Sequence, residues 1–160
     1  MAKGLQGLLY QALNLPMRAL LRSPVHGIAS SNLCVVMYAG RRSGRRYETP
    51  LSYVRDGARV FLLTSRDTRW WTNFVLVAND PGGSPLPVEI LIAGKILRGR
   101  AHTIHHDRER LRASVRHFLT ALPRDARVYR IGLDAERRPK EADLMRALER
   151  LVMVEVTLEA

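Results

Sequence analysis

The chain has 160 residues, of which 46% are hydrophobic and 26% are charged, and this composition excludes an intrinsically disordered protein. Its 26 basic residues against 15 acidic ones give a net charge of +11, which favours an anionic partner such as a phosphorylated cofactor, nucleic acid or an acidic lipid surface. The single cysteine, Cys34, lies in an apolar run and has no partner for a disulfide within the chain, so we expect it to be buried and unreactive in a reducing cytoplasm.

The N-terminal segment, residues 1–27, is predicted to be an amphipathic helical element preceding a domain over residues 28–160. Leucine and alanine recur at helical spacing over residues 4–14, Pro16 interrupts the pattern, and the apolar face continues to Arg22. Two interpretations stay open: the helix lies on an anionic membrane, or it covers one end of the folded domain. We expect no secretory leader, and no run reaches the about 20 apolar residues that span a bilayer.

The middle of the chain is predicted to form strands joined by short turns. Strands are expected over residues 33–39, 47–54 and 59–65, with a tight turn at 55–57, as an antiparallel meander. Thr68 is expected to cap a short helix that carries Trp70 and Trp71.

The second half alternates between strands and helices. Residues 79–87 ("NDPGGSPLP") are predicted to be a loop, followed by a hairpin over 88–104 with "AGK" at its tip. Helices are expected over 107–122 and 139–151, and a closing strand is expected in "LVMVEVTL". With about six antiparallel strands and roughly three or four helices, the chain is predicted to be an α+β protein whose sheet curls into a barrel flanked by helices.

The turn "AGRRSGRRYETP" concentrates positive charge between two strands. Arg41, Arg42, Arg45 and Arg46 fall within six residues, and glycines at 40 and 44 allow backbone N–H groups to point at one spot. Guanidinium groups match phosphate and carboxylate oxygens in pairs. An anion-binding turn and an ordinary solvated hairpin tip are the two interpretations.

A second motif, "TSRDTRWWTNF", follows the third predicted strand. Ser65 and Arg66 end that strand, where side chains project past the rim of a sheet. Because Trp70 and Trp71 are adjacent they face different ways, so we expect one in the core and the other at a ring-binding pocket or the rim. The histidines have no metal-binding spacing, so no metal site is predicted.

These segments together resemble the deazaflavin-dependent nitroreductase family, a group of split β-barrel flavin and deazaflavin oxidoreductases related to pyridoxamine phosphate oxidase-like proteins. The resemblance runs from about residue 28 to the C-terminus and rests on "GRRSGRRYETPLSYVRDGARVFLLTS", "RWWTNF" and "LVMVEVTL". It implies that the sheet of approximately six antiparallel strands is a split β-barrel that binds the deazaflavin coenzyme F420, with FMN as the alternative cofactor.

The resemblance also implies roles for particular positions. Arg41, Arg42 and Ser43 would hold the phosphate or the acidic tail of the coenzyme. The other cofactor-binding positions that it implies are Gly44, Arg45, Tyr47, Thr49, Pro50, Leu51, Leu63, Thr64, Ser65, Arg66, Trp70, Trp71 and Asn73. Ser65 and Tyr129 are the candidate catalytic residues: Ser65 would hydrogen-bond the electron acceptor, and Tyr129 would donate a proton or orient the ring.

Three departures from the family pattern stand out. Tyr47 occupies a position where the family has arginine, so Arg45 or Arg46 would supply that charge. Only "RDT" separates Ser65 from Arg69, which shortens a loop near the phosphate, and "VANDPGGSPLP" is an insertion.

Three functional hypotheses follow. The first is a cytoplasmic F420H2-dependent oxidoreductase that passes hydride to a quinone, an activated alkene or a nitroaromatic compound, either free or peripheral to the inner face of the membrane. The second is a non-catalytic barrel that binds a flavin, haem or a fatty acid. The third, nucleic-acid binding, is disfavoured because aromatic residues are only 6% of the chain and no nucleic-acid-binding motif is present. A homodimer fits either of the first two.

Overall fold

The computed structural model describes residues 32–75 and 85–160. The predicted N-terminal helix, the boundary at residue 27 and most of the predicted loop over 79–87 lie outside the described residues. Seven strands form one antiparallel sheet: β1 (Leu33–Ala39), β2 (Arg46–Ser52), β3 (Val54–Asp56), β4 (Arg59–Ser65), β5 (Leu86–Ile92), β6 (Lys95–Ile104) and β7 (Leu151–Leu158).

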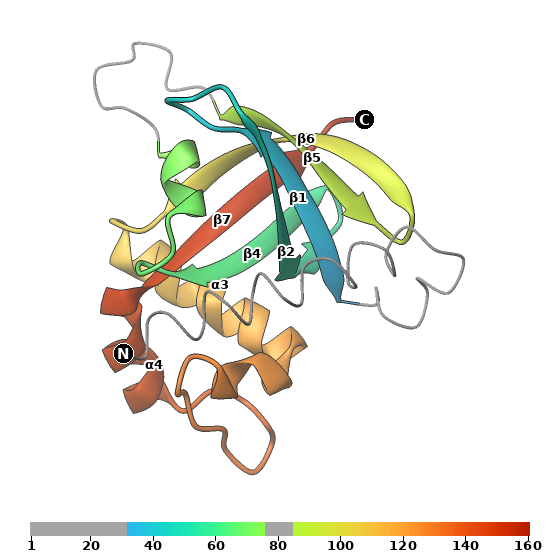
Figure 1. Cartoon of the computed structure of the whole chain (residues 1–160). Coiled ribbons are helices and arrows are strands. Elements are labelled where there is room, and N and C mark those ends of the chain that lie inside the picture. Colours follow the sequence, from blue (N-terminus) through green and yellow to red (C-terminus); the bar gives the residue numbers. More distant parts are fainter. Residues whose placement is uncertain (1–31, 76–84) are drawn as a thin grey trace.

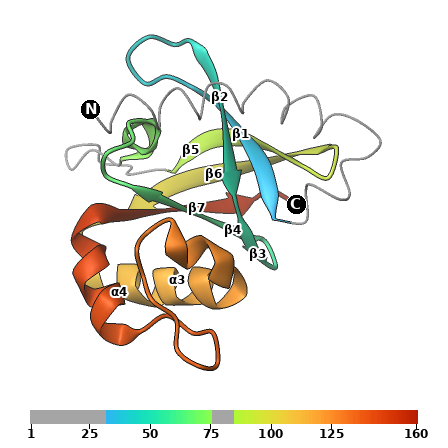
Figure 2. The same cartoon turned by 60° about the horizontal axis from the view of Figure 1, so that its bottom comes forward.

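The sheet has the strand order β2-β1-β5-β6-β7-β4-β3 and curls into a barrel (Figures 1 and 2). Its two edge strands, β2 and β3, are parts of the same stretch of chain, separated only by Tyr53. The first part pairs with β1 and the second pairs with β4, in the register Val54↔Phe61. The chain therefore connects the two edges of the sheet, and the barrel is split where this stretch passes from one edge to the other.

This break accounts for the difference between the predicted and observed numbers of strands. The sequence predicts one strand over residues 47–54, whereas the structure has two that pair on opposite edges. The alternation of side chains between the two faces of the sheet continues through Tyr53, where the chain changes its partner strand. The sequence pattern therefore does not show the break. The fifth strand also begins at Leu86, inside the predicted loop.

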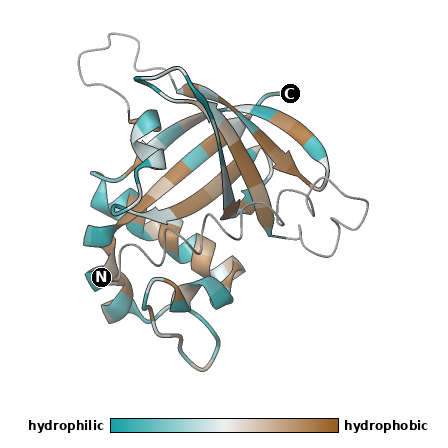
Figure 3. Cartoon of the chain, viewed as in Figure 1, coloured by the Kyte–Doolittle hydropathy of each residue, from teal (hydrophilic) through white to brown (hydrophobic). Residues whose placement is uncertain are grey.

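Two large apolar clusters fill the two faces of the sheet, and a small third cluster comprises Val35, Met37 and Leu91. Alternate residues of β1, β4 and β7 point into the barrel, including Cys34, Leu62 and Val154, each with no exposed surface. Their neighbours Leu63 and Met153 face the helices instead. Because β7 is buried on both faces, its residues are apolar nearly throughout, as the brown colour along the strand shows (Figure 3).

The α-helices lie together on one side of the barrel, whereas the short green helix over Trp70–Phe74 lies apart from them (Figure 2). The described part of the chain contains two α-helices, α3 (Arg108–Ala121) and α4 (Glu141–Ala147), and three 3-10 helices, η1 (Trp70–Phe74), η2 (Pro123–Arg127) and η3 (Leu148–Arg150). The described residues thus hold fewer α-helices than the three or four expected from the sequence. No helix in the described ranges combines the length and the apolar character that crossing a bilayer requires.

Helix α3 agrees closely with its prediction. Asp107 is the N-cap, and its side chain accepts a hydrogen bond from the backbone N–H of Arg110 at 3.0 Å. The apolar residues on one face of the helix are buried: Leu111, Val115, Phe118, Leu119 and Leu122. The helix expected over 139–151 is shorter, because α4 passes into η3 and the last strand begins at Leu151. Pro139 lies before it, in an isolated bridge with Leu133.

Candidate functional site

The arginine turn connects β1 to β2 and is closed by its own backbone. Gly40 N–H donates to the carbonyl of Arg45 at 2.7 Å, and Gly44 N–H donates to the carbonyl of Gly40 at 2.8 Å. Gly44 has φ +65°, the left-handed conformation expected from the sequence. Gly40 is glycine for another reason: a Cβ there would lie 2.6 Å from Cε2 of Tyr47. Of the two glycines in the turn, only Gly44 has a positive φ.

Helix η1 is tied directly to this turn. Arg41 N–H donates to Oδ1 of Asn73 at 2.9 Å, and Nη1 of Arg41 donates to the carbonyl of Val75 at 2.7 Å. Asn73 in turn donates through Nδ2 to the carbonyl of Trp70 at 2.8 Å. The two motifs predicted separately, the arginine turn and the tryptophan segment, therefore meet at one place.

A groove of about 990 Å³ lies between the turn and η1. Arg41, Arg42 and Arg69 line it, and no carboxylate side chain lines it among the described residues. Its other lining residues are Tyr38, Gly40, Ser43, Tyr47, Trp70, Thr72 and Asn73. Three guanidinium groups in a lining that holds no described acid suit an anionic group with several oxygen acceptors.

Aromatic rings form a second wall of the groove. Tyr38 and Tyr47 stack with ring centroids 5.7 Å apart and an interplanar angle of 25°. Phe74 meets Tyr38 edge-on at 5.2 Å, and Trp70 lies 6.5 Å from Tyr38. Tyr47 remains 43% exposed, so one of its faces is open to a planar ligand.

Burial changes the acidity of one hydroxyl at this wall. The pKa of Tyr38 is raised, chiefly by burial and to a smaller extent by Tyr47. A hydrogen bond between the hydroxyls of Tyr38 and Thr49, 3.4 Å apart, lowers this pKa and partly offsets the shift. Tyr38 therefore stays protonated and serves the groove as a neutral ring and a hydrogen-bonding group.

The end of β4 reaches the groove indirectly. Nε1 of Trp70 donates to Oγ1 of Thr64 at 3.1 Å, and that hydroxyl lies 2.8 Å from Oγ1 of Thr68. Thr68, expected to cap the helix, instead donates to the carbonyl of Ser65 at 2.9 Å. Thr64 thus positions the indole that lines the groove.

Several predicted cofactor-binding residues do not line the groove. Arg66 donates through Nη2 to the carbonyl of His105 at 2.8 Å and lines a separate pocket of about 280 Å³. Leu51 and Leu63 belong to the two cores. The half-buried residues Thr49, Pro50 and Ser65, and the exposed Gly44 and Arg45, also lie outside the lining. Arg46 forms an ion pair with Glu89 at 2.6 Å, so neither arginine proposed to replace the charge at Tyr47 lies in the groove.

Trp71 faces away from the groove, toward the histidines before α3. Its ring centroid lies 5.4 Å from that of His105, which in turn lies 3.9 Å from that of His106. Nε1 of Trp71 and Nδ1 of His105 are buried, and neither has a hydrogen-bond partner among the described residues. The pKa of His105 is lowered by burial, by His106 and by Arg66, so its neutral form is favoured. The two adjacent tryptophans do face different ways, as predicted.

Tyr129 lies in the helical layer. Its hydroxyl donates to the backbone carbonyl of Leu63 at 2.8 Å, and its ring packs against the core between sheet and helices. Neither Tyr129 nor Ser65 lines the groove.

Sequence reasoning missed Tyr38, Arg69 and Thr72 as groove residues. Tyr38 could have been predicted from the sequence, because it is the last residue of β1 that the alternation of the strand points inward. Arg69 directly precedes the tryptophans, and its role depends on η1 lying against the turn, which is a tertiary contact.

No family model matches the sequence, and no curated protein matches it. Solved structures do match. An F420-H2 dependent reductase is 16% identical, with a TM-score of 0.50, and the match covers 81% of this chain and 95% of that one. A Clostridium acetobutylicum protein related to general stress protein 26 of B. subtilis, of the pyridoxinephosphate oxidase family, is 15% identical, with a TM-score of 0.51 and coverage of 88% and 84%. These likenesses show that the chain has the fold of this group of proteins, and at such identities they show the fold alone.

Proposed function

From this fold and this groove, we propose that the protein is an F420H2-dependent oxidoreductase that transfers hydride to a small electrophilic acceptor such as a quinone, an activated alkene or a nitroaromatic compound. One observation carries the proposal: three arginines and three aromatic rings line a single groove that no described carboxylate lines. A deazaflavin coenzyme combines a phosphate and an acidic tail with a planar ring. The arginines of the groove complement the phosphate and the tail, and its aromatic residues complement the ring.

The residues present fit the coenzyme in their chemistry. Arg42 and Arg69 would bind the phosphate or the tail, with Ser43 as a neutral donor. Arg41 would contribute charge while its hydrogen bonds to Asn73 and Val75 hold the turn against η1. When bound, the coenzyme supplies the hydride, and the protein supplies binding and orientation.

The aromatic residues would orient the ring. Tyr47 presents an open face, and its stack on Tyr38 keeps that face fixed relative to the barrel. The hydrogen bond from Trp70 to Thr64 holds the indole in place. Tyr47 thus compensates for the missing arginine by stacking, a different interaction from the expected ion pair.

On the acceptor side, Ser65 is proposed to hydrogen-bond the acceptor as negative charge develops on it. Tyr129 would have to give up its hydrogen bond to Leu63 in order to donate a proton, so this hydrogen bond favours a structural role for it over a proton-donating one.

The direct test is a titration of the protein with F420 and, separately, with FMN, followed by absorption and fluorescence. We expect F420 to bind, with Arg42→Ala weakening the affinity about tenfold, because a charge-assisted contact to an anionic oxygen is lost. Arg45→Ala removes the same charge from the same turn outside the groove and is the matched control. No spectral change with either cofactor, or equal effects of the two variants, contradicts the proposal.

A second candidate function rests on the position of the candidate catalytic residues. Because Ser65 and Tyr129 lie outside the groove lining, the protein is alternatively a non-catalytic barrel that binds a flavin, haem or a fatty acid. Turnover assays with a panel of quinones and nitro compounds separate the two: binding without turnover supports the second function.

A further inference from the structure

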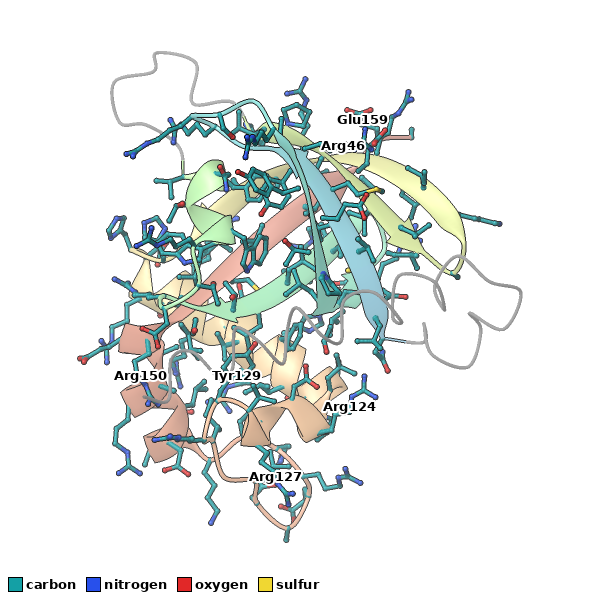
Figure 4. The ribbon with its side chains drawn as sticks, viewed as in Figure 1. Arg46, Arg124, Arg127, Tyr129, Arg150 and Glu159 are labelled. Carbon is teal, nitrogen blue, oxygen red and sulfur yellow. The ribbon has the colours of Figure 1, made fainter. Side chains whose placement is uncertain are left out.

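A second arginine-rich pocket lies in the helical layer. The stretch that follows α3, comprising η2 and the loop up to Arg137, encloses a pocket of about 630 Å³. Arg124 and Arg127 lie in this layer, at the opposite end of the molecule from Arg46 on β2 (Figure 4). The pocket shares no lining residue with the groove beside the arginine turn.

The pocket combines an apolar floor with a cationic rim. Ala126 and Ile131 are only 1% and 3% exposed and form part of the floor. The rim carries four arginines, Arg124, Arg127, Arg130 and Arg137, and no carboxylate side chain belongs to the described lining. Such a surface matches a ligand that has both an anionic and an apolar part.

Of the three acids in this stretch, one pairs with a rim arginine and two pair with an arginine outside the pocket. Asp125 pairs with Arg124 at 3.4 Å, and Asp134 and Glu136 both pair with Arg138, which does not line the pocket. The other three rim residues, Arg127, Arg130 and Arg137, have no ion-pair partner within the described part of the chain. The rim therefore keeps an excess of positive charge that neighbouring side chains do not neutralise.

The backbone is strained at two of the rim arginines. Arg130 has φ +57° and Arg137 has φ +61°. This left-handed conformation costs free energy in a residue that has a Cβ, whereas glycine adopts it without that cost. Only one other described non-glycine residue, Ala93, has a positive φ. Strained positions often mark functional sites, and here both place an arginine at the same pocket.

The backbone around the pocket is also held rigidly. Ile131 N–H donates to the carbonyl of Ala126 at 2.9 Å, and Gly132 N–H donates to Oδ2 of Asp143 at 3.0 Å. Lys140 N–H donates to the carbonyl of Gly132 at 2.8 Å, which fixes the far end of the loop. The pocket is therefore formed before any ligand arrives, which lowers the entropic cost of binding.

We propose that this pocket is a second anion-binding site that takes a phosphorylated molecule carrying an apolar group. The guanidinium groups of Arg127, Arg130 and Arg137 bind the phosphate, and the apolar group lies on the floor beside Ile131. The phosphate belongs either to a free metabolite or to a lipid headgroup, which present the same chemistry to the rim. The proposal goes beyond the hydride-transfer function and does not depend on it, because the groove and the pocket are separate.

The test uses glycine variants that relieve strain while they remove charge. Pyrophosphate is titrated into the full-length protein by calorimetry, with Arg42→Ala as the background so that the groove contributes less. We expect Arg130→Gly and Arg137→Gly each to weaken pyrophosphate binding about tenfold. Their melting temperatures should equal or exceed that of the background, because glycine accepts the left-handed φ. Lys95→Ala, which removes one charge from the exposed first residue of β6, is the matched control.

A parallel arm identifies the source of the phosphate. For the same variants, the fraction of protein that sediments with phosphatidylcholine vesicles is compared with the fraction that sediments with vesicles containing phosphatidylglycerol. Loss of sedimentation in Arg130→Gly and Arg137→Gly, but not in Lys95→Ala, identifies a lipid headgroup. Sedimentation that these variants do not change, together with weakened pyrophosphate binding, identifies a free phosphate compound. If both glycine variants behave as Lys95→Ala does in both arms, the proposed site is overturned.

Discussion

At the scale of single residues, Gly40 and Gly44 stand in the same turn and are glycine for different reasons. Gly44 has a left-handed backbone with open space around it, whereas Gly40 makes room for the ring of Tyr47. We expect Gly40→Ala to displace that ring from its stack on Tyr38 and so to change the near-UV circular dichroism. Because Tyr47 is exposed on one side and can move, the free energy of unfolding should fall by less than about 1 kcal/mol.

Gly44→Ala is the matched control for this prediction. Its Cβ meets nothing within 4 Å, so the only cost is the left-handed φ, about 1 kcal/mol. We expect its aromatic circular dichroism to match that of the wild type. An unchanged spectrum in Gly40→Ala would show that the ring of Tyr47 is not held by Gly40.

The group formed by His102, Arg110 and the buried Glu155 leads to a pH dependence. Nε2 of His102 lies 3.2 Å from Nη2 of Arg110, which lies 3.5 Å from the carboxylate of the buried Glu155. Burial lowers the pKa of His102, Arg110 lowers it further, and Glu155 opposes the shift. The unfolded chain therefore takes up this proton at a higher pH than the folded protein does.

We accordingly expect the free energy of unfolding to decrease as the pH falls from neutral through the ordinary histidine pKa of about 6.5, and to level off below the folded-state pKa. His105 contributes in the same direction, because its pKa is also lowered. Denaturant titrations across this range should show a flatter profile in a His102→Gln, His105→Gln double variant. A wild-type profile without any slope in this window would contradict the prediction.

At the scale of elements, β4 shows how the split barrel satisfies its backbone. Strand β3 pairs only with residues 59–61 of β4, and beyond it the hydroxyl of Tyr129 donates to the carbonyl of Leu63. The helical layer thus supplies a hydrogen bond on a strand edge that β3 does not reach.

This contact separates two roles for Tyr129. If the residue is structural, Tyr129→Phe leaves a buried carbonyl without its donor and lowers the free energy of unfolding by about 1–3 kcal/mol, and turnover per folded molecule is retained. If it donates a proton in catalysis, turnover falls out of proportion to stability. We expect the first result, measured by chemical denaturation together with an F420H2 oxidation assay.

At the scale of the whole molecule, the lone cysteine reports on the barrel as a unit. Cys34 has no exposed surface, and burial raises the pKa of its thiol, so its thiolate is scarce in the folded state. We expect Cys34 to react with a thiol reagent only when the whole protein unfolds. The rate of labelling should therefore depend on denaturant concentration as strongly as the equilibrium unfolding transition does. Rapid labelling without denaturant would mean that β1 opens separately.

Local patterns determined much of this protein by themselves. The capped amphipathic helix from Arg108, the hairpin around Gly94, the inward position of Cys34 and the charged turn after β1 all depend on neighbours within a few residues. Periodicity, capping and turn chemistry act over that range, so the sequence is sufficient to predict these features.

The tertiary structure decided the rest. The break at Tyr53, the contact between η1 and the arginine turn, and the position of Arg69 in the groove each join segments that are distant in sequence or change partner within a strand. Arg124, Arg127, Arg130 and Arg137 are spread over 14 residues and form a pocket only because the loop after η2 folds back on itself. Such contacts depend on closure of the whole barrel and on its packing against the helices, which no local pattern encodes.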